Sequence, residues 1–261
     1  MTPPEVLLHR DQDVLAQAAA ARLVTRIADA QAARGAASVV LTGGGVGTAV
    51  LAVLAATGAR DAVDWGRLDL WWGDERFVPR GDPERNETGA RAVLLDHVPV
   101  DPARVHAMPA PDGPDGDDPE AAAERYAAEL RAAAGAGGAG PVPPFDVLML
   151  GVGPDAHVAS LFPDMAGPRE EKLSVVAVRG APKPPPTRIS LTFPALRAAR
   201  EVWMLAAGGS KAEAVRRGLS PNADPERVPC AGARGRERTL FLLDRAAASA
   251  LPPGEEGAAP A

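Results

Sequence analysis

The 261-residue sequence lacks the features of a secreted, membrane-bound or nucleic-acid-binding protein. Its one cysteine, Cys230, cannot form a disulfide within the chain, which favours a reducing compartment. No run reaches the roughly 18 apolar residues of a membrane span, and the first residues lack the basic and apolar segments of a signal peptide. The net charge of −6 provides no general basic field for nucleic-acid phosphates or anionic lipid. We therefore expect a cytoplasmic protein that binds neither nucleic acid nor membrane.

Several well-known catalytic motifs are also missing. No His-x-x-x-His pair and no Cys/His grouping has metal-ligand spacing, so we expect no metal site. Gly-x-Ser-x-Gly does not occur, which argues against an acyl-serine mechanism. Lysine is scarce, with three residues against 25 arginines, and we interpret this as a coding-composition bias without functional meaning.

What is present is the composition of a globular protein, with 46% hydrophobic and 24% charged residues. Apolar runs of strand length alternate with patterns of helical period, which predicts a Rossmann-like α/β fold: a mainly parallel sheet with helices on both faces. The runs with strand character are 38–41, 68–72, 146–150, 173–178, 188–192, 202–206 and 239–243, and the helical patterns are 13–34, 48–56, 83–97, 119–134 and 210–217.

We expect a single domain over residues 1–251, because no break in composition divides the chain. Residues 252–261 lack apolar periodicity and are predicted to be a disordered tail. Gly- and Pro-rich segments at 109–119, 135–144 and 180–187 are predicted to be surface loops. In a sheet of this kind, ligands bind at the carboxyl ends of the strands.

A glycine-rich loop, Thr42-Gly-Gly-Gly-Val-Gly47, lies between a predicted strand and a predicted helix. Its backbone N–H groups and the positive end of the helix dipole could hold a phosphate. It matches neither the dinucleotide fingerprint nor the P-loop. A tight turn with no ligand explains the motif equally well.

Three charged residues, Asp74, Glu75 and Arg76, follow the next apolar strand. Arg76 could hold a phosphate with its planar fork, while the two carboxylates could position it or bind substrate hydroxyls. The alternative is a solvated loop with a local ion pair. Trp71 and Trp72, just before this segment, are expected in the core.

The segment GVGPDAHVASLFPD at 151–164 brings a histidine, His157, next to the end of a buried strand. An imidazole can remove a proton from water at neutral pH, and a carboxylate such as that of Asp155 can fix its tautomer. The alternative is a structural histidine, the role that we assign to His9, His97 and His106. Two cations at further strand ends, Arg188 and Lys211, could contact an anion or be surface charges.

In their order along the chain, these segments resemble the 6-phosphogluconolactonase family. The resemblance rests on LTGGG at 41–45, WWGDERFVP at 71–79 with Asn86 beyond it, GVGPDAHVASLFPD at 151–164, RISLTFPAL at 188–196 and GGSKAEAV at 208–215. It implies a Rossmann-like fold, no required cofactor, and hydrolysis of 6-phospho-D-glucono-1,5-lactone to 6-phosphogluconate in the oxidative pentose phosphate pathway. The implied partner is this small sugar-phosphate lactone, and we expect a monomer.

The resemblance also implies roles for individual residues. His157 would be the catalytic base, oriented by Asp155. The implied substrate and phosphate contacts are Thr42, Gly43, Gly44, Gly45, Asp74, Glu75, Arg76, Asn86, Arg188 and Lys211. The sequence departs from the family pattern at Ala156 and Asp164, where glycine is usual or common, and at Val46-Gly47-Thr48 in place of a frequent Ser-Thr-Pro.

Two other functions compete with this interpretation. A glucosamine-6-phosphate deaminase shares the fold, but its pattern has a glutamate five residues after the histidine, where this chain has Phe162, and usually a tyrosine where this chain has Arg76. A non-catalytic sugar-phosphate sensor would carry a DNA-binding module. The roughly 35 residues before the glycine-rich loop contain no helix-turn-helix and no basic face.

Overall fold

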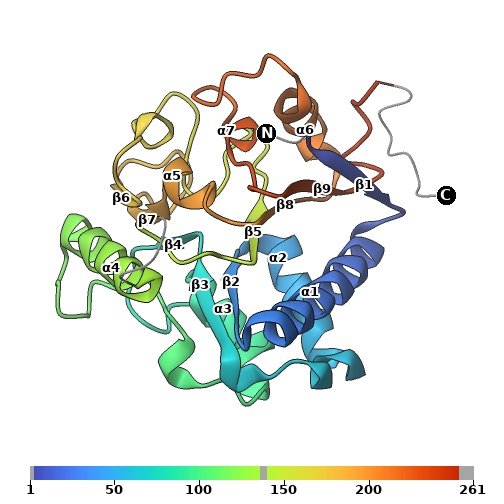
Figure 1. Ribbon diagram of the computed structural model, residues 1–261. Helices are drawn as coiled ribbons and strands as arrows, with labels where there is room; N and C mark the ends of the chain where they lie inside the picture. Colours follow the sequence, from blue (N-terminus) through green and yellow to red (C-terminus); the bar gives the residue numbers. More distant parts are fainter. Residues whose placement is uncertain (1–2, 136–139, 253–261) are drawn as a thin grey trace.

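A parallel sheet forms the centre of the computed structural model, which describes residues 3–135 and 140–252 (Figure 1). Its six strands lie in the order β1–β9–β8–β5–β2–β3, and every pairing is parallel. The strands are β1 (Glu5–His9), β2 (Ala37–Leu41), β3 (Leu68–Trp72), β5 (Val147–Gly151), β8 (Glu201–Ala206) and β9 (Arg238–Asp244). The predicted mainly parallel α/β fold is confirmed.

Helices cover both faces of this sheet. They are α1 (Gln12–Arg34), α2 (Gly44–Ala56), α3 (Asn86–Val93), α4 (Pro119–Ala134), α5 (Phe193–Leu196), α6 (Ala212–Leu219) and α7 (Pro229–Gly232). Helices α1 and α2 pack side by side below the sheet in Figure 1, and α6 and α7 lie above it. The helices therefore leave the strand ends, rather than the sheet faces, open to ligands.

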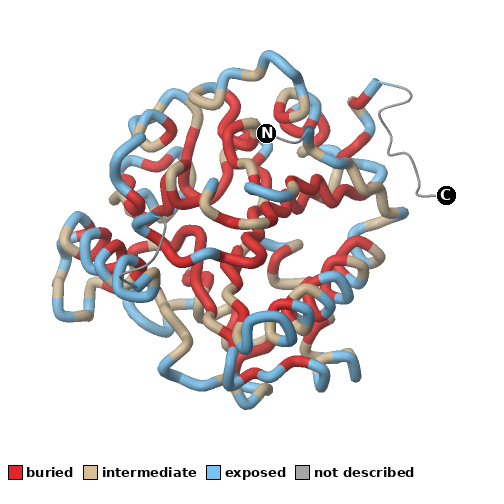
Figure 2. Tube along the Cα trace, viewed as in Figure 1, coloured by how far each residue is buried: buried red, intermediate tan, exposed pale blue. Residues whose placement is uncertain are grey.

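The long helix α1 begins and ends where its sequence provides capping residues. The Asp11 carboxylate accepts a hydrogen bond from the Val14 N–H at 2.9 Å, and a cap of this kind stabilises a helix by about 1 kcal/mol. Gly35 ends the helix with φ of 79°, which glycine adopts without a steric penalty. The apolar side faces the sheet, and Figure 2 shows the resulting alternation of buried and exposed residues along α1.

The core follows the inner strands, whose residues are mostly apolar and almost wholly buried in Figure 2. Trp71 and Trp72 are each 1% exposed, so their prediction as core residues is confirmed. Burial of each large apolar side chain stabilises the fold by about 1.5–3 kcal/mol. This packing fixes the strand ends on which the polar residues lie.

A second sheet, not predicted from the sequence, lies beside the first. Strands β4 (Asp74–Arg76), β7 (Arg188–Leu191) and β6 (Val175–Val178) pair antiparallel in the order β4–β7–β6, and α4 packs against β6 and β7 (Figure 1). The runs 173–178 and 188–192 were predicted as strands, and this is confirmed, but they pair antiparallel in this separate sheet and do not join the parallel one. The alternative of a solvated loop at 74–76 is wrong, because these residues form β4 and pair with β7.

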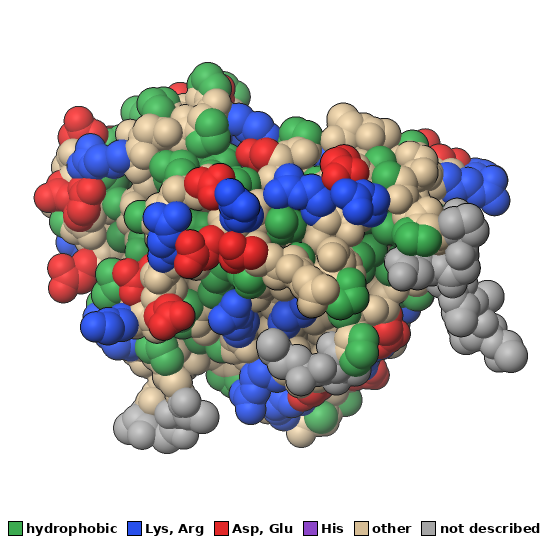
Figure 3. Space-filling model, turned by 90° about the horizontal axis from the view of Figure 1, so that it is seen from above, with side chains coloured by type: hydrophobic (Ala, Val, Ile, Leu, Met, Phe, Trp, Pro, Cys, Tyr) green, Lys and Arg blue, Asp and Glu red, His purple; other side chains and the backbone are tan. Residues whose placement is uncertain are grey.

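The surface has no extended field of one sign on the face drawn in Figure 3, where basic side chains lie among acidic ones. Among the described residues, no helix is both long and apolar enough to cross a membrane. Part of the predicted loop at 135–144, and all of the predicted tail except Pro252, lie outside the described residues.

Candidate active site

A cavity of about 250 Å³ lies at the carboxyl ends of the parallel strands β2, β5 and β8. The structure therefore has a cavity at the carboxyl ends of the strands, where a ligand was expected. Residues from six separate segments line it: Thr42, Gly43, Gly44, Asp74, Arg76, Asn86, Gly151, Val152, Gly153, His157, Ala159, Lys183, Pro184, Arg188 and Lys211.

A histidine–carboxylate pair lies at this cavity. The Nδ1 atom of His157 is 2.5 Å from Oδ1 of Asp155, and the imidazole is 14% exposed. Burial alone would raise the pKa of Asp155, but the hydrogen bond with His157 and the charges of His157 and Lys183 lower it to about 2. Asp155 is therefore ionised at neutral pH, fixes the proton on Nδ1, and leaves Nε2 as the basic nitrogen.

Gly153 makes this pairing possible. A Cβ atom at this position would lie 2.0 Å from Nδ1 of His157 and 2.5 Å from Oδ1 of Asp155. The backbone turns tightly here, because Gly153 N–H donates to the His157 carbonyl and Ala156 N–H donates to the Gly153 carbonyl, each at 2.9 Å. Any side chain at residue 153 would collide with both the imidazole and the carboxylate.

The loop around His157 has a strained backbone. Ala156, Ala159 and Asp164 have φ values of 73°, 49° and 61°, in the left-handed region that favours glycine. Each such residue costs about 1–3 kcal/mol and persists only where its surroundings hold it. At Ala156 the side chain is fully buried, and the carbonyl accepts a hydrogen bond from the Cys230 N–H at 2.9 Å. The departure at Ala156 thus keeps the conformation that glycine would adopt.

Phe162 packs against the histidine. The two ring centroids are 4.5 Å apart, and Phe162 is 1% exposed. The position that the deaminase pattern fills with a carboxylate is therefore an apolar surface under the imidazole.

The glycine-rich loop presents the start of α2 to the cavity. A Cβ atom on Gly43 would lie 1.8 Å from Oδ1 of Asn86, so only glycine fits there. Gly44 has φ of 78°, and the Thr42 hydroxyl accepts a hydrogen bond from the Gly151 N–H at 3.2 Å. Thr42, Gly43 and Gly44 line the cavity as predicted, whereas Gly45 does not, because the helix has already turned away.

Asp74, Arg76 and Asn86 also line the cavity. The Asp74 carboxylate accepts a hydrogen bond from the Ser160 hydroxyl at 2.6 Å, and the Asn86 amide donates to the Asp74 carbonyl at 2.8 Å. The Arg76 guanidinium donates to the Glu84 carbonyl at 2.5 Å and has no carboxylate partner among the described residues. Its positive charge is therefore available to an anion in the cavity.

Glu75 has a different position from the one expected. It is 1% exposed and accepts hydrogen bonds from the N–H groups of Asn86, Glu87 and Arg76, at 2.7, 2.9 and 2.9 Å. Burial raises the pKa of Glu75 to about 7, against the opposing effects of Arg85 and these backbone donors. The prediction that Glu75 binds substrate is corrected: its carboxylate caps the first turn of α3 and does not line the cavity.

Three basic side chains from later segments complete the lining. Arg188 and Lys211 were predicted here, whereas Lys183, whose Nζ is 3.8 Å from Oδ1 of Asp155, was not. Burial lowers the pKa of Lys211, and the neighbouring Lys183 charge lowers it further, against the opposing charge of Asp155. The only sequence signal for Lys183 was its place in a proline-rich loop next to Arg188.

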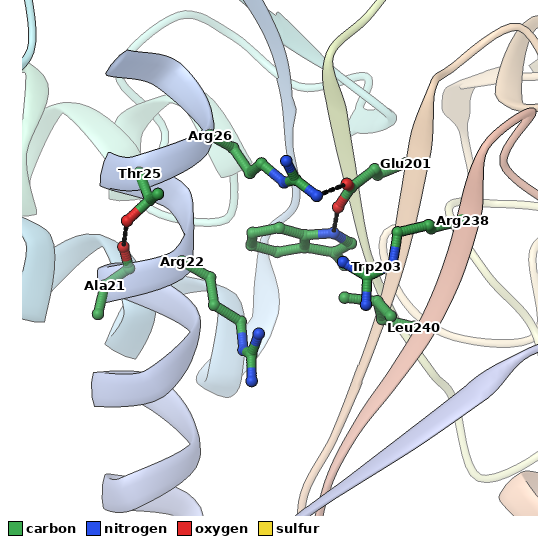
Figure 4. Close-up of a pocket in the computed structure, with 8 residues that line it drawn as sticks. All are labelled: Ala21, Arg22, Thr25, Arg26, Glu201, Trp203, Arg238 and Leu240. Carbon is green, nitrogen blue, oxygen red and sulfur yellow. Dashed lines mark hydrogen bonds and ion pairs between the residues drawn. The ribbon is translucent and has the colours of Figure 1, made fainter. Parts of the chain in front are cut away.

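Another pocket rich in arginine lies at the opposite end of the sheet, between α1 and the first residues of β8 and β9 (Figure 4). There Arg26 pairs with the buried Glu201, which also accepts a hydrogen bond from Trp203 at 2.9 Å. Arg238 is paired with Glu5 at 2.8 Å. Acidic partners thus neutralise Arg26 and Arg238, and the one carboxylate of the lining, that of Glu201, is already paired with Arg26 and Trp203.

Among the described residues, no three His, Cys, Asp or Glu side chains are grouped to hold a metal ion. The groups available for chemistry in the cavity are the imidazole, the paired carboxylate, backbone N–H groups and the cations. Such a set can activate water and hold an anionic substrate.

Comparisons with known proteins identify the family. A family model described as glucosamine-6-phosphate isomerases/6-phosphogluconolactonase matches residues 10–242. A 6-phosphogluconolactonase of Streptomyces coelicolor is 64% identical over 249 residues, 95% of each chain, and one of Mycobacterium tuberculosis is 50% identical over 242 residues, 93% of this chain and 96% of that one.

The fold matches as well as the sequence. The solved structure of 6-phosphogluconolactonase from Trypanosoma brucei superposes with a TM-score of 0.80 and 29% identity, and the match covers 97% of this chain and all of that one. The chain therefore belongs to the glucosamine-6-phosphate isomerase/6-phosphogluconolactonase family.

Proposed function

We propose that this protein is a 6-phosphogluconolactonase, which hydrolyses 6-phospho-D-glucono-1,5-lactone to 6-phospho-D-gluconate. The observation that carries the proposal is the imidazole of His157, paired with Asp155 at a cavity lined by cations. Relatives named 6-phosphogluconolactonase, up to 64% identical over nearly the whole chain, support a lactonase, that is, a carboxylic ester hydrolase.

In the proposed mechanism, His157 is the general base. Its Nε2 removes a proton from water as the water oxygen attacks the C1 carbonyl carbon of the lactone. The tetrahedral intermediate collapses with cleavage of the bond between C1 and the ring oxygen, and the imidazolium returns a proton to that oxygen. Asp155 holds the imidazole in the required tautomer and stabilises the imidazolium while it exists.

The phosphate group, distant from C1, anchors the substrate. The N–H groups at the start of α2, with Arg76 and Lys211, supply positive charge and donors for it. Anchoring holds C1 against the water and turns the attack into an effectively intramolecular step. Because a lactone is an activated ester, one base and accurate positioning account for the reaction.

The deaminase function is less compatible with this cavity. Phe162 packs against His157 with its centroid 4.5 Å away and leaves no carboxylate at the position where the deaminase pattern has glutamate. A sensor without catalysis would not need a base paired with a carboxylate at the cavity. The lactonase is therefore the function that the geometry favours.

The wild-type protein tests the proposal directly. Freshly generated 6-phosphogluconolactone should form 6-phosphogluconate well above the spontaneous rate, and glucosamine 6-phosphate should release no ammonia. Ammonia release without lactone hydrolysis would replace the proposal with a deaminase, and product binding without catalysis would replace it with a sensor. A role in the oxidative pentose phosphate pathway, a cytoplasmic location and a monomeric state stay predictions.

A further inference from the structure

The loop that joins β6 to β7 carries Lys183 to the cavity. Prolines flank the lysine at residues 182, 184, 185 and 186, which restricts the backbone on both sides. The Nζ atom lies 3.8 Å from Oδ1 of Asp155, too far for a hydrogen bond, so its three donors remain available. This ammonium thus faces the cavity with attraction from Asp155 but no direct bond to it.

Arg188 holds that loop in place. Its Nε donates to the Pro185 carbonyl at 3.1 Å, and its Nη2 donates to the carbonyls of Lys183 and Pro184 at 3.0 and 3.3 Å. The residue is 4% exposed, and its Nη1 lies 3.9 Å from Asp74. Most of the guanidinium donors are therefore used on the backbone around Lys183 rather than directed at a ligand.

The placement of lysine in this chain supports a specific need for an ammonium group. The sequence has only three lysines against 25 arginines, yet two of the three, Lys183 and Lys211, line this one cavity. The third lysine, Lys172, is exposed outside the cavity, and arginine supplies the other basic side chains of the chain. An ammonium is compact and offers rotatable donors, whereas a guanidinium is larger and planar. In a cavity of only about 250 Å³, a compact ammonium leaves more room for a phosphate than a guanidinium would.

We propose that Lys183 binds the phosphate group of the substrate together with Lys211, and that Arg188 is a positioning residue that acts through the Lys183 loop. This inference rests on the proposed function. A phosphate ester carries a charge of about −1.5 to −2 at neutral pH, which two ammonium groups and the donors at the start of α2 match. The proposal gives Arg188 a different role from the one that the sequence resemblance implied, which was direct contact with the phosphate.

Two lactones distinguish phosphate binding from a role at C1. Lys183→Met should raise KM for 6-phosphogluconolactone about tenfold to 100-fold, the value of a hydrogen bond to a charged group, and raise the inhibition constant of inorganic phosphate. Hydrolysis of unphosphorylated glucono-1,5-lactone should not change. Lys183→Arg should recover only part of the affinity. Lys172→Met, the same change at an exposed lysine outside the cavity, is the matched control and should leave both reactions as they were.

A double-mutant cycle tests the role of Arg188. Arg188→Lys should raise KM for the phosphorylated lactone, but should add little in a Lys183→Met background, because both changes remove the same contact. Full additivity would place Arg188 on the substrate itself. If the Arg188 variant does not fold, Lys183→Met alone decides the phosphate contact.

The inference is overturned if Lys183→Met leaves KM for the phosphorylated lactone and phosphate inhibition unchanged. An equal loss with both lactones would also overturn it and assign Lys183 to the chemistry at C1. Failure of the proposed function is a separate result, because the wild-type protein would then not hydrolyse 6-phosphogluconolactone at all.

Discussion

Two histidines of this chain lie beside carboxylates, and both side chains are 14% exposed. His157 follows the carboxyl end of β5 and lines the cavity; Asp155 holds its Nδ1, and its Nε2 has no partner among the described residues. His106 lies near the amino end of β3, where Nδ1 is 2.6 Å from Glu129 and Nε2 is 3.1 Å from Asp69. The two histidines therefore do not differ in exposure. They differ in the number of ring nitrogens that contact a carboxylate, which is two in His106 and one in His157.

The surroundings of His106 make it a structural cation. Its ring stacks on Trp71 with centroids 3.7 Å apart. Burial alone would lower the pKa of His106, but the hydrogen bonds to Asp69 and Glu129, together with their charges, raise it to about 9. An imidazole that stays protonated at neutral pH cannot accept a proton from water. The comparison teaches that a carboxylate neighbour alone does not make a histidine a candidate base, because a ring nitrogen without a partner is needed as well.

The largest expected effect falls on His157. His157→Gln should lower kcat by about 10²–10⁴-fold, the range for loss of a general base, with the fold intact. Steady-state kinetics with the fresh lactone measure the change, and circular dichroism checks the fold. If His157→Gln keeps the wild-type kcat, His157 is not the base, and the two histidines do not differ in function.

A smaller loss is expected at Asp155. Asp155→Asn should lower kcat by about 10-fold to 100-fold, because the imidazole remains but loses its orienting charge. Asp155→Glu is the matched control that keeps the charge on a longer arm. Equal activity of the Asn variant and the wild type would show that the pairing at Nδ1 does not contribute to the rate.

At His106 the expected effect is on stability. His106→Gln should lower the free energy of unfolding by about 1–3 kcal/mol at pH 6 and leave kcat unchanged. Because the folded pKa of about 9 lies above the ordinary value of 6.5, the contribution is complete below about pH 6.5 and is lost as the pH rises through about 9. Urea unfolding at pH 6 and pH 9.5 measures the difference, which should shrink at the higher pH.

The smallest effect concerns backbone strain, which the His157 loop has and the His106 segment lacks. Asp164 has φ of 61° with an exposed side chain, so Asp164→Gly should raise the free energy of unfolding by up to about 1 kcal/mol. Asp164→Ala keeps the Cβ atom and should not stabilise. If the two variants are equally stable, the strain at this residue is negligible.

Much of this arrangement could be predicted from the sequence because it depends on local patterns. Most strands of the parallel sheet are visible in the sequence as apolar runs. Residues such as His157 and Lys211 lie a few positions after the end of such a run. The three-stranded sheet could not be predicted in this way. Its β4 strand is short and polar, and it pairs with β7 more than a hundred residues further along the chain.

The errors in the candidate site have the same origin. Glu75 follows a strand end as Asp74 does, but strand alternation turns its carboxylate inward to the N–H groups of α3. Lys183 has no strand end of its own, and only the three-dimensional path of its loop brings it to Asp155. The scarcity of lysine was visible in the sequence, but it gained meaning only when two of the three lysines were found in one cavity.

The most direct test of the central claim is the ratio of kcat for His106→Gln to kcat for His157→Gln, measured with fresh 6-phosphogluconolactone at pH 7 and at a temperature where both variants are folded. If only His157 is the base, the His106 variant keeps the wild-type kcat and the ratio is about 10²–10⁴. A ratio near one, or a larger loss in the His106 variant, would contradict the account.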